Sequence, residues 1–295
     1  MKIIFRQVHT EDTEATEKNC FRKLCVLRVL CVSLFLLLCA AAANAQTTTN
    51  LSAAEIQGRE LAQEILSQRP AENAISTGVL LISDGSGNRS KIPIVCRTIV
   101  SVSVANTNVI IPDWQIIYQA ALTNQTQYLR VTHVTNQTEI YTYSTNANAA
   151  VPVVGDIPLV GHLFSSSHEV FGPALTTSYA GSDFWLGDLG LEFLHWPEQK
   201  VLPKTTNLKR GRSYTLLEST NPNPSTNGYS RVLSWIDKET GGILEAEAYD
   251  VNGKLLKDFA PKSFKKVNGQ WELQEMEIRN VQTGSSTKLE FDLKK

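Results

Sequence analysis

The side chains best suited to acid–base or metal chemistry are few and widely spaced. After residue 45 the chain contains four histidines, His133, His162, His168 and His195. None lies at a distance from another histidine, a cysteine or a carboxylate that is typical of a metal site. His162 and His168 are six residues apart, which does not put both on one face of a helix. We therefore predict no metal site and no cofactor.

Motifs for catalysis are also scarce. No Gly-x-Ser-x-Gly elbow, phosphate-binding glycine loop or dinucleotide fingerprint occurs in its required context. Acidic residues gather at Glu245/Glu247 and at Glu272/Glu275/Glu277, where they alternate with apolar residues as on the wet face of a sheet. The main prediction is a protein without catalytic residues, not an enzyme. A hydrolase of envelope polymers is the minor alternative, which two carboxylates converging in a cleft would support.

Cysteine content and charge narrow the class of protein further. Cys96 is the only cysteine after residue 45, so no disulfide can form within that part of the chain. It lies in the apolar run 92–96, which predicts a buried thiol. The same part of the chain has 22 basic and 25 acidic residues, and this balance argues against a nucleic-acid partner.

The N-terminus has the layout of an export signal. Polar residues 1–23 lead into an uncharged apolar run of about 15 residues, short of the ~20 that a membrane-spanning helix needs. Ala43-Asn44-Ala45 has the small-x-small pattern of a cleavage site. We predict a signal peptide over 1–45, cleaved after Ala45, and one domain over 46–295 that is not an integral membrane protein. The predicted location is the periplasm, and an uncleaved anchor is the alternative.

Cys39 raises the separate question of a lipid anchor. A lipoprotein signal has a small residue directly before its cysteine, whereas Leu38 precedes Cys39. We predict that Cys39 is removed with the signal peptide, and its acylation is the alternative.

The elements that would position any site are mostly strands. One helix is predicted from Ser52 to Pro70, with Ser52 and Glu55 as a capping box. Runs rich in Val, Ile, Thr and Tyr follow it at 77–82, 91–105, 113–121, 127–134 and 138–143. Further strands are predicted at 213–219, 229–237, 243–250, 254–259, 262–267, 270–281 and 286–293. Asn-Gly pairs at 252–253 and 268–269 predict hairpins, so the strands form an antiparallel meander.

Between these two sets of strands lies a cluster of large apolar residues. Ser182 is predicted to cap a short helix that begins at Asp183, with Phe184, Trp185 and Phe193 among the apolar residues that follow. Two interpretations stay open: ordinary core, or the lining of a site for an apolar ligand.

The same segment carries a resemblance to a known family. Gly181-Ser182-Asp183-Phe184 followed by Asp188-Leu189 resembles a signature of LolA-like outer-membrane lipoprotein-sorting proteins. The strand at 234–237 and the hairpin at 249–257 are similar to paired strands of that family, and Trp271, Met276, Asn280 and Thr287-x-Leu289 are similar to its C-terminal strands. The resemblance is best defined over 175–293. Trp185-Leu186-Gly187 departs from it, because more polar residues are usual between the two aspartates.

The resemblance implies a fold class and a function. The expected fold is mainly β (α+β), a curved antiparallel sheet forming a half-barrel closed by a few helices over an apolar cavity. The expected function is a lipid or lipoprotein carrier that binds acyl chains, with an inner-membrane transporter or outer-membrane receptor as a partner. Residues predicted to line the cavity are Phe184, Trp185, Leu189, Phe193 and Trp235.

An envelope scaffold or sensor that binds a protein partner is the second hypothesis. A void of several hundred Å3 inside the half-barrel would favour the carrier, and an interior filled by side chains would favour the scaffold.

Overall fold

The computed structural model describes residues 51–100, 114–134, 137–147, 167–203, 206, 208–267 and 270–293. All of these belong to one compact unit. The predicted signal peptide, Cys39, His162 and the Asn-Gly pair at 268–269 lie outside the described residues.

The helix α1 (Ala53–Leu66) begins at the predicted capping box. The Ser52 side chain accepts a hydrogen bond from the Glu55 N–H, and the Glu55 carboxylate accepts one from the Ser52 N–H at 2.7 Å. The helix ends at Leu66, four residues before Pro70, which was predicted to end it. Gly58 permits a close approach to the sheet, because a Cβ there would lie 2.5 Å from the Lys200 backbone nitrogen.

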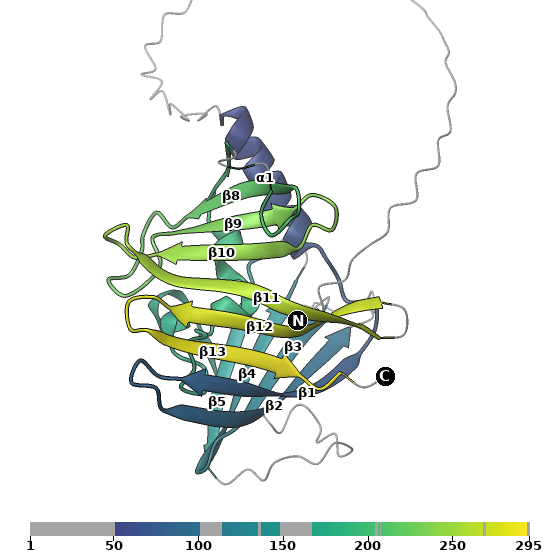
Figure 1. Cartoon of the computed structure of the whole chain (residues 1–295), viewed down its shortest axis with the longest axis vertical. Coiled ribbons are helices and arrows are strands. Elements are labelled where there is room, and N and C mark those ends of the chain that lie inside the picture. The colour runs from purple at the N-terminus through teal and green to yellow at the C-terminus, as the bar shows by residue number, and fades with distance from the viewer. Residues whose placement is uncertain are drawn as a thin grey trace, which may run out of the picture. The chain divides into compact units, whose positions relative to one another are not determined.

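Every strand among the described residues belongs to one antiparallel sheet (Figure 1). The N-terminal strands are β1 (Ala74–Ser83), β2 (Arg89–Val100), β3 (Trp114–Ala121), β4 (Gln125–His133), β5 (Ile140–Ala147) and β6 (His168–Val170). The C-terminal strands are β7 (Glu198–Leu202), β8 (Tyr214–Thr220), β9 (Arg231–Asp237), β10 (Ile243–Tyr249), β11 (Leu255–Val267), β12 (Gln270–Asn280) and β13 (Ser285–Phe291).

The two sets of strands join edge to edge. The order is β6-β5-β4-β3-β2-β1-β13-β12-β11-β10-β9-β8-β7, so each set is a meander and β1 pairs with β13 between them. Leu80 of β1 lies opposite Leu289 of β13 in this junction. The N-terminal strands therefore continue the same sheet as the C-terminal ones.

Two local predictions are wrong. The predicted strands 254–259 and 262–267 form the single strand β11, which passes through Pro261 with register shifts between Pro261 and Phe264. The segment from Ser182 forms no capped helix, because it turns sharply and then forms the short 3-10 helices η2 (Asp188–Gly190) and η3 (Glu192–His195). Another 3-10 helix, η1 (Gly172–Thr176), precedes it.

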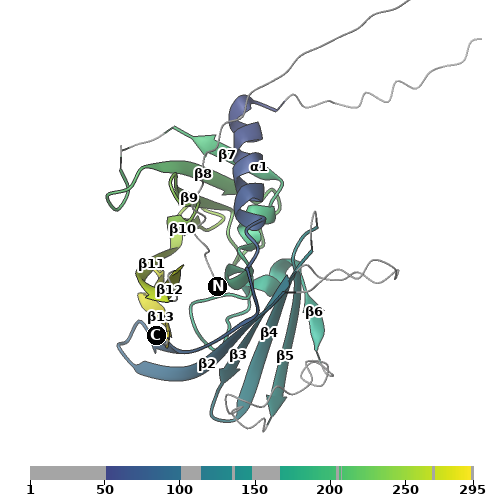
Figure 2. The ribbon, with the colours of Figure 1, turned by 90° about the vertical axis from the view of Figure 1, so that its right-hand side faces the viewer.

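The sheet curves but does not close into a barrel, which agrees with the predicted half-barrel. The helix α1 and the 3-10 helices lie inside the curve (Figure 2). Two apolar clusters cover this inner face. One joins β1–β5, β12 and β13 to Phe184 and Leu186, and it includes the predicted buried thiol of Cys96. The other joins β8–β10 to α1 through Ala62 and to η3 through Phe193 and Leu194.

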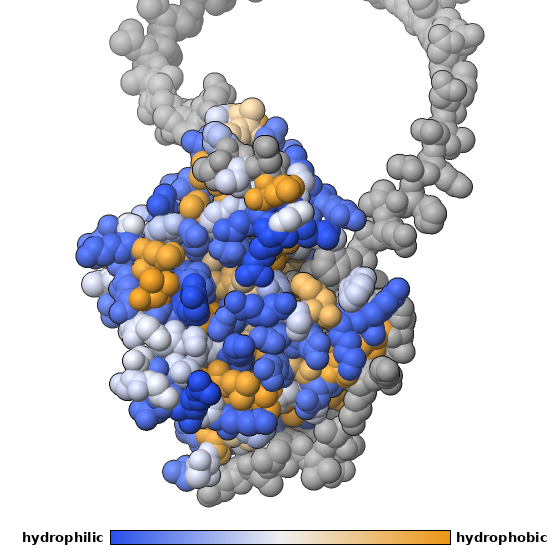
Figure 3. All heavy atoms as spheres, in the orientation of Figure 1, coloured by the Kyte–Doolittle hydropathy of each residue, from blue (hydrophilic) through white to orange (hydrophobic). Residues whose placement is uncertain are grey.

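The outer face of β11–β13 carries cross-strand ion pairs. Lys262 contacts Glu277 at 2.7 Å, and Lys288 contacts Glu275 at 3.3 Å. Space-filling atoms on this side are mostly hydrophilic, with apolar residues in separate spots (Figure 3). The acidic residues at 245–247 and 275–277 thus belong to a wet sheet face, as their alternation predicts.

Candidate functional site

The inner face is covered by residues 178–197, whose path begins with a tight turn. Ala180 and Gly181 both have positive φ, at 56° and 70°, a conformation that glycine adopts at little cost. The Ser182 hydroxyl donates to the Tyr179 carbonyl at 2.6 Å and accepts from the Phe184 N–H at 3.2 Å. The Gly-Ser pair of the family signature therefore shapes a turn.

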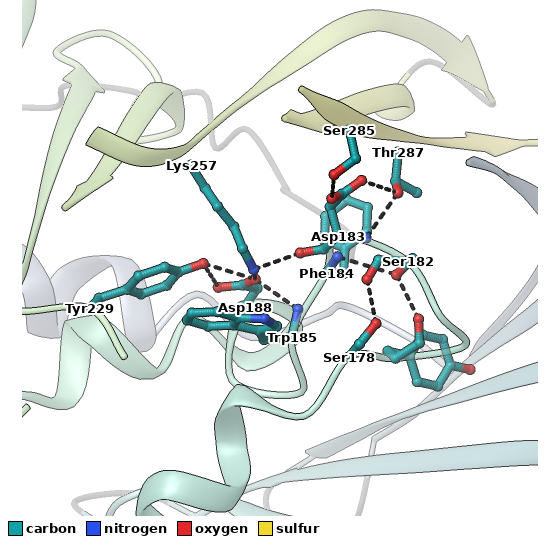
Figure 4. A network of polar contacts seen from close by, with 11 residues as sticks. Ser178, Ser182, Asp183, Phe184, Trp185, Asp188, Tyr229, Lys257, Ser285 and Thr287 are labelled. Atoms are coloured by element: carbon teal, nitrogen blue, oxygen red, sulfur yellow. Dashed lines mark hydrogen bonds and ion pairs between the residues drawn. The ribbon is translucent and has the colours of Figure 1, made fainter. Parts of the chain in front are cut away.

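Asp183 fixes this turn to strand β13. Its carboxylate accepts hydrogen bonds from Ser285 Oγ at 2.5 Å and from Thr287 Oγ1 at 2.8 Å (Figure 4). Its N–H donates to Thr287 Oγ1 at 2.9 Å. Thr287 is fully buried, so these bonds form away from water, where an unsatisfied partner would be costly.

Asp188 fixes the next turn through three partners. Its carboxylate accepts from the Trp185 N–H at 2.8 Å and from the Tyr229 hydroxyl at 2.9 Å. Lys257 of β11 lies 3.4 Å from the same carboxylate and donates to the Asp183 carbonyl at 2.7 Å (Figure 4). Its Nζ also lies 3.4 Å from the centre of the Trp185 ring, as in a cation–π contact.

Lys257 is a buried cation, and the nearby Asp188 carboxylate compensates for its loss of hydration. Only 2% of its side chain is exposed. Burial lowers the pKa of Lys257, and the Asp188 charge opposes that shift. The two aspartates of the signature thus anchor the 178–197 segment to the sheet, and their role in the fold is structural.

A large pocket lies beside this anchored segment. We call it the α1 pocket; its volume is about 790 Å3, within the range of small-molecule sites. One wall is α1, and the other is built from the ends of β3–β5 and residues 194–199. Its lining residues are Leu51, Ile56, Arg59, Glu60, Ala62, Gln63, Leu66, Ser67, Arg69, Trp114, His133, Val134, Gln137, Thr138, Glu139, Leu194, His195, Trp196, Pro197 and Gln199.

Two smaller pockets adjoin it. The first, of about 270 Å3, is lined by Trp185, Phe193 and Tyr229, and it shares Trp196 with the α1 pocket. The second, of about 70 Å3, includes Leu189 and shares Trp114 with the α1 pocket. Together the three pockets are lined by residues between Trp185 and Pro197 of this segment.

The residues predicted to line a cavity are placed in four different environments. Trp185 and Phe193 line the 270 Å3 pocket, and Leu189 lines the 70 Å3 pocket. Phe184 is 1% exposed and packs in the core. Trp235 packs with Tyr214 and Leu216, away from the other four residues. Its strand neighbour Ile236 belongs to the inner cluster, so Trp235 points to the outer face.

A polar cluster on the strand wall of the α1 pocket was not predicted. The Nδ1 of His133 contacts Glu139 Oε1, and the Nε2 of His195 contacts the same oxygen at 3.2 Å. The Trp114 ring stacks on His133 with centroids 3.3 Å apart. Glu139 is only 4% exposed. We call these three residues, His133, Glu139 and His195, the His–Glu–His cluster.

Glu139 has one oxygen in use and one unused. Its Oε2 is buried and has no hydrogen-bond partner among the described residues. Burial alone would raise the pKa of Glu139, but the hydrogen bonds and charges of His133 and His195 outweigh it and hold the pKa below its usual value. The carboxylate is therefore ionised at neutral pH although it is buried.

The two imidazoles and the nearby acids can be compared with what a metal site or a hydrolase would need. Both imidazoles bind one oxygen directly, and the described part of the chain has no set of three such side chains that could hold a metal ion. Glu60 also lines the α1 pocket but is exposed on the helix. Burial raises the pKa of Glu192, yet this residue lines the 270 Å3 pocket. The buried acids thus open to different pockets.

Solved structures with the same architecture decide the fold. A putative outer membrane lipoprotein-sorting protein domain from Vibrio parahaemolyticus superposes with a TM-score of 0.59 at 18% identity, covering 81% of this chain and 92% of that one. A LolA superfamily protein from Nitrosomonas europaea superposes with a TM-score of 0.51 at 14% identity, covering 82% and 93%. The chain has a LolA-like fold.

A third solved structure with this architecture is a DUF1329 family protein from Desulfovibrio piger, with a TM-score of 0.59, 17% identity, and coverage of 81% of this chain and 91% of that one. In sequence, a family model described as an uncharacterized protein matches residues 169–294, close to the range of the predicted resemblance. Curated proteins give no match. Over its described residues, the LolA-like chain has no helix long and apolar enough to cross a membrane.

Proposed function

We propose that this protein is an exported, non-catalytic carrier or sorting protein that holds the acyl chain of a lipid or lipoprotein. The α1 pocket is the proposed binding site, and Trp185, Leu189 and Phe193 extend it along the 178–197 segment. The periplasm is the proposed location, because a free acyl chain in an aqueous compartment costs about 0.8 kcal/mol for each exposed CH2.

The size and lining of the α1 pocket are the observation that carries this proposal. About 790 Å3 is enough for a single chain, and apolar residues stand on both walls, such as Leu66 on the helix and Trp114 on the strands. The solved lipoprotein-sorting domain of the same fold adds support for the class of ligand.

A second candidate function is an envelope scaffold or sensor that binds a protein partner. The observation that favours it is the centre of the inner face, where Phe184, Leu186 and Tyr179 are fully buried and fill the concavity with side chains. The α1 pocket lies to one side of this filled region, so the two functions differ in whether that pocket takes a ligand.

Binding of a fluorescent acyl probe tests the proposal with two matched variants. Ile56 is 45% exposed and lines the α1 pocket, whereas Val281 is 47% exposed in the turn after β12. Both positions tolerate a charge without loss of core packing, so neither variant is expected to unfold. Ile56→Glu places a carboxylate beside the probe's chain and is expected to weaken binding about tenfold, the cost of burying roughly two CH2 groups less well.

Val281→Glu is expected to bind like the wild type. Probe binding that does not saturate in the wild type, or equal loss in both variants, would contradict the proposed carrier function.

A further inference from the structure

The unused oxygen of Glu139 points to the kind of ligand that the α1 pocket takes. We propose that this pocket binds an amphiphile whose polar end carries an ammonium group, and that this group displaces the side chains that close off the buried Glu139 Oε2 and donates a hydrogen bond to it. This inference rests on the proposed function, because it places the polar end of the same ligand whose chain contacts the apolar walls.

The first support is the incomplete hydrogen bonding of a buried carboxylate. Glu139 is 4% exposed, and it lines the α1 pocket with Oε2 unpartnered among the described residues. A carboxylate oxygen only accepts hydrogen bonds, so its missing partner must be a donor. Leaving a buried charged acceptor unpaired is costly, which favours a site that is completed by a ligand.

The second support is that the carboxylate is held in place and in its ionised form. His133 and His195 both bind Oε1, and Trp114 stacks on the ring of His133 and restricts its rotation. With one oxygen fixed by two imidazoles, the direction of the other is set. A pre-oriented acceptor loses little conformational entropy when a donor binds.

The third support is the sign of the charges. The buried anion of the pocket wall is the Glu139 carboxylate, and both imidazoles bind its other oxygen. The cations that line the pocket are Arg59 on α1 and Arg69 in the segment after it, and both are exposed, so solvent screens them. A buried anion discriminates between ligand charges more strongly than exposed cations do, and it favours an ammonium over a phosphate or sulfate.

Three amphiphiles with the same chain test this inference on the full protein. Dodecylammonium carries N–H donors and a positive charge at neutral pH, dodecyltrimethylammonium carries the charge without donors, and dodecyl sulfate carries a negative charge. Their affinities are measured by displacement of the acyl probe, below the concentration at which each forms micelles. The wild type is expected to bind dodecylammonium about tenfold more tightly than either of the others, as for a hydrogen bond to a charged group.

Two variants locate the preference. Glu139→Gln keeps the shape of the side chain and removes its charge, so it is expected to bind all three amphiphiles with similar affinity. Glu277→Gln removes an equivalent charge on the outer face, where Glu277 pairs with Lys262, and is expected to keep the tenfold preference. Circular dichroism melts establish that both variants are folded, and the wild-type comparison stands without either variant.

The outcomes separate this inference from the proposed function. If all three amphiphiles bind the wild type equally, or if the preference persists in Glu139→Gln, the partner of Oε2 is a buried water only and the inference is wrong, while the carrier function stands. If no amphiphile and no acyl probe binds, the carrier function itself is wrong. A preference for dodecyl sulfate would also overturn the ammonium assignment.

Discussion

Two lysines of strand β11 show how differently the two faces of the sheet use charge. Lys257 is 2% exposed on the inner face, where it contacts Asp188, the Asp183 carbonyl and the Trp185 ring. Lys262, five residues later, is 37% exposed and contacts Glu277 on the outer face. The two residues are of the same type, so their difference in burial decides how much each contributes to stability. The inner face joins distant segments, while the outer face pairs neighbouring strands.

The largest expected difference between buried and exposed positions comes from two phenylalanines. Phe184→Ala removes a ring that is 1% exposed in the inner core, and it is expected to lower the free energy of unfolding by about 4 kcal/mol through lost burial and a residual cavity. Phe171→Ala removes a ring that is 77% exposed, with an expected change within about 0.5 kcal/mol. Urea denaturation measures both. Similar losses at the two positions would mean that the 178–197 segment is not packed as described.

The two lysines provide the next largest difference. Lys257→Met leaves Asp188 without its buried cation, and the free energy of unfolding is expected to fall by about 3 kcal/mol. Lys262→Met breaks only a partly exposed pair and is expected to cost less than about 1 kcal/mol. The same denaturation series measures both variants. A loss in Lys262→Met as large as that in Lys257→Met would break the contrast between the faces.

A smaller difference in the free energy of unfolding is expected between the wild type and Glu139→Gln, and it should depend on pH. The pKa of Glu139 is lower in the folded protein than in the unfolded chain. Ionised Glu139 therefore stabilises the fold at any pH above its unfolded-chain pKa. This stabilisation is lost as the pH falls through the lower, folded-state pKa. The wild type is expected to exceed Glu139→Gln in free energy of unfolding by about 2 kcal/mol at pH 7. This gap should narrow as the pH falls toward about 3, well below the usual pKa of a glutamate.

Glu277→Gln is the outer-face control for this measurement. It is expected to change the free energy of unfolding by less than about 1 kcal/mol at either pH, since Glu277 pairs with a partly exposed lysine. A gap between wild type and Glu139→Gln that widens on acidification would contradict the assigned direction of the pKa shift.

Local features of the fold could be predicted because local residues determine them. Ser52 and Glu55 form their capping box within one turn, and Gly253 has the positive φ that its hairpin between β10 and β11 requires. The β1–β13 junction could not be predicted, because it joins segments about two hundred residues apart whose pairing depends on the whole sheet.

The candidate site was predicted less completely, for a geometric reason. Trp235 and Ile236 are both large and apolar, so alternation alone could not tell which of them faces the concavity. The His–Glu–His cluster needs the β4–β5 hairpin to bring His133 to Glu139 and the path of η3 to bring His195 to them. Only the contact between His133 and Glu139 could have been found in the sequence, because these two polar residues flank the turn between two predicted strands.

Native mass spectrometry of the purified protein, followed by lipid extraction, tests the central claim most directly. We expect the protein to appear partly as a complex whose added mass matches one acyl-bearing lipid. We expect Ile56→Glu to reduce that fraction and Val281→Glu to preserve it. A wild-type protein that is empty under native conditions, and that also fails to take up an acyl probe, would contradict the account.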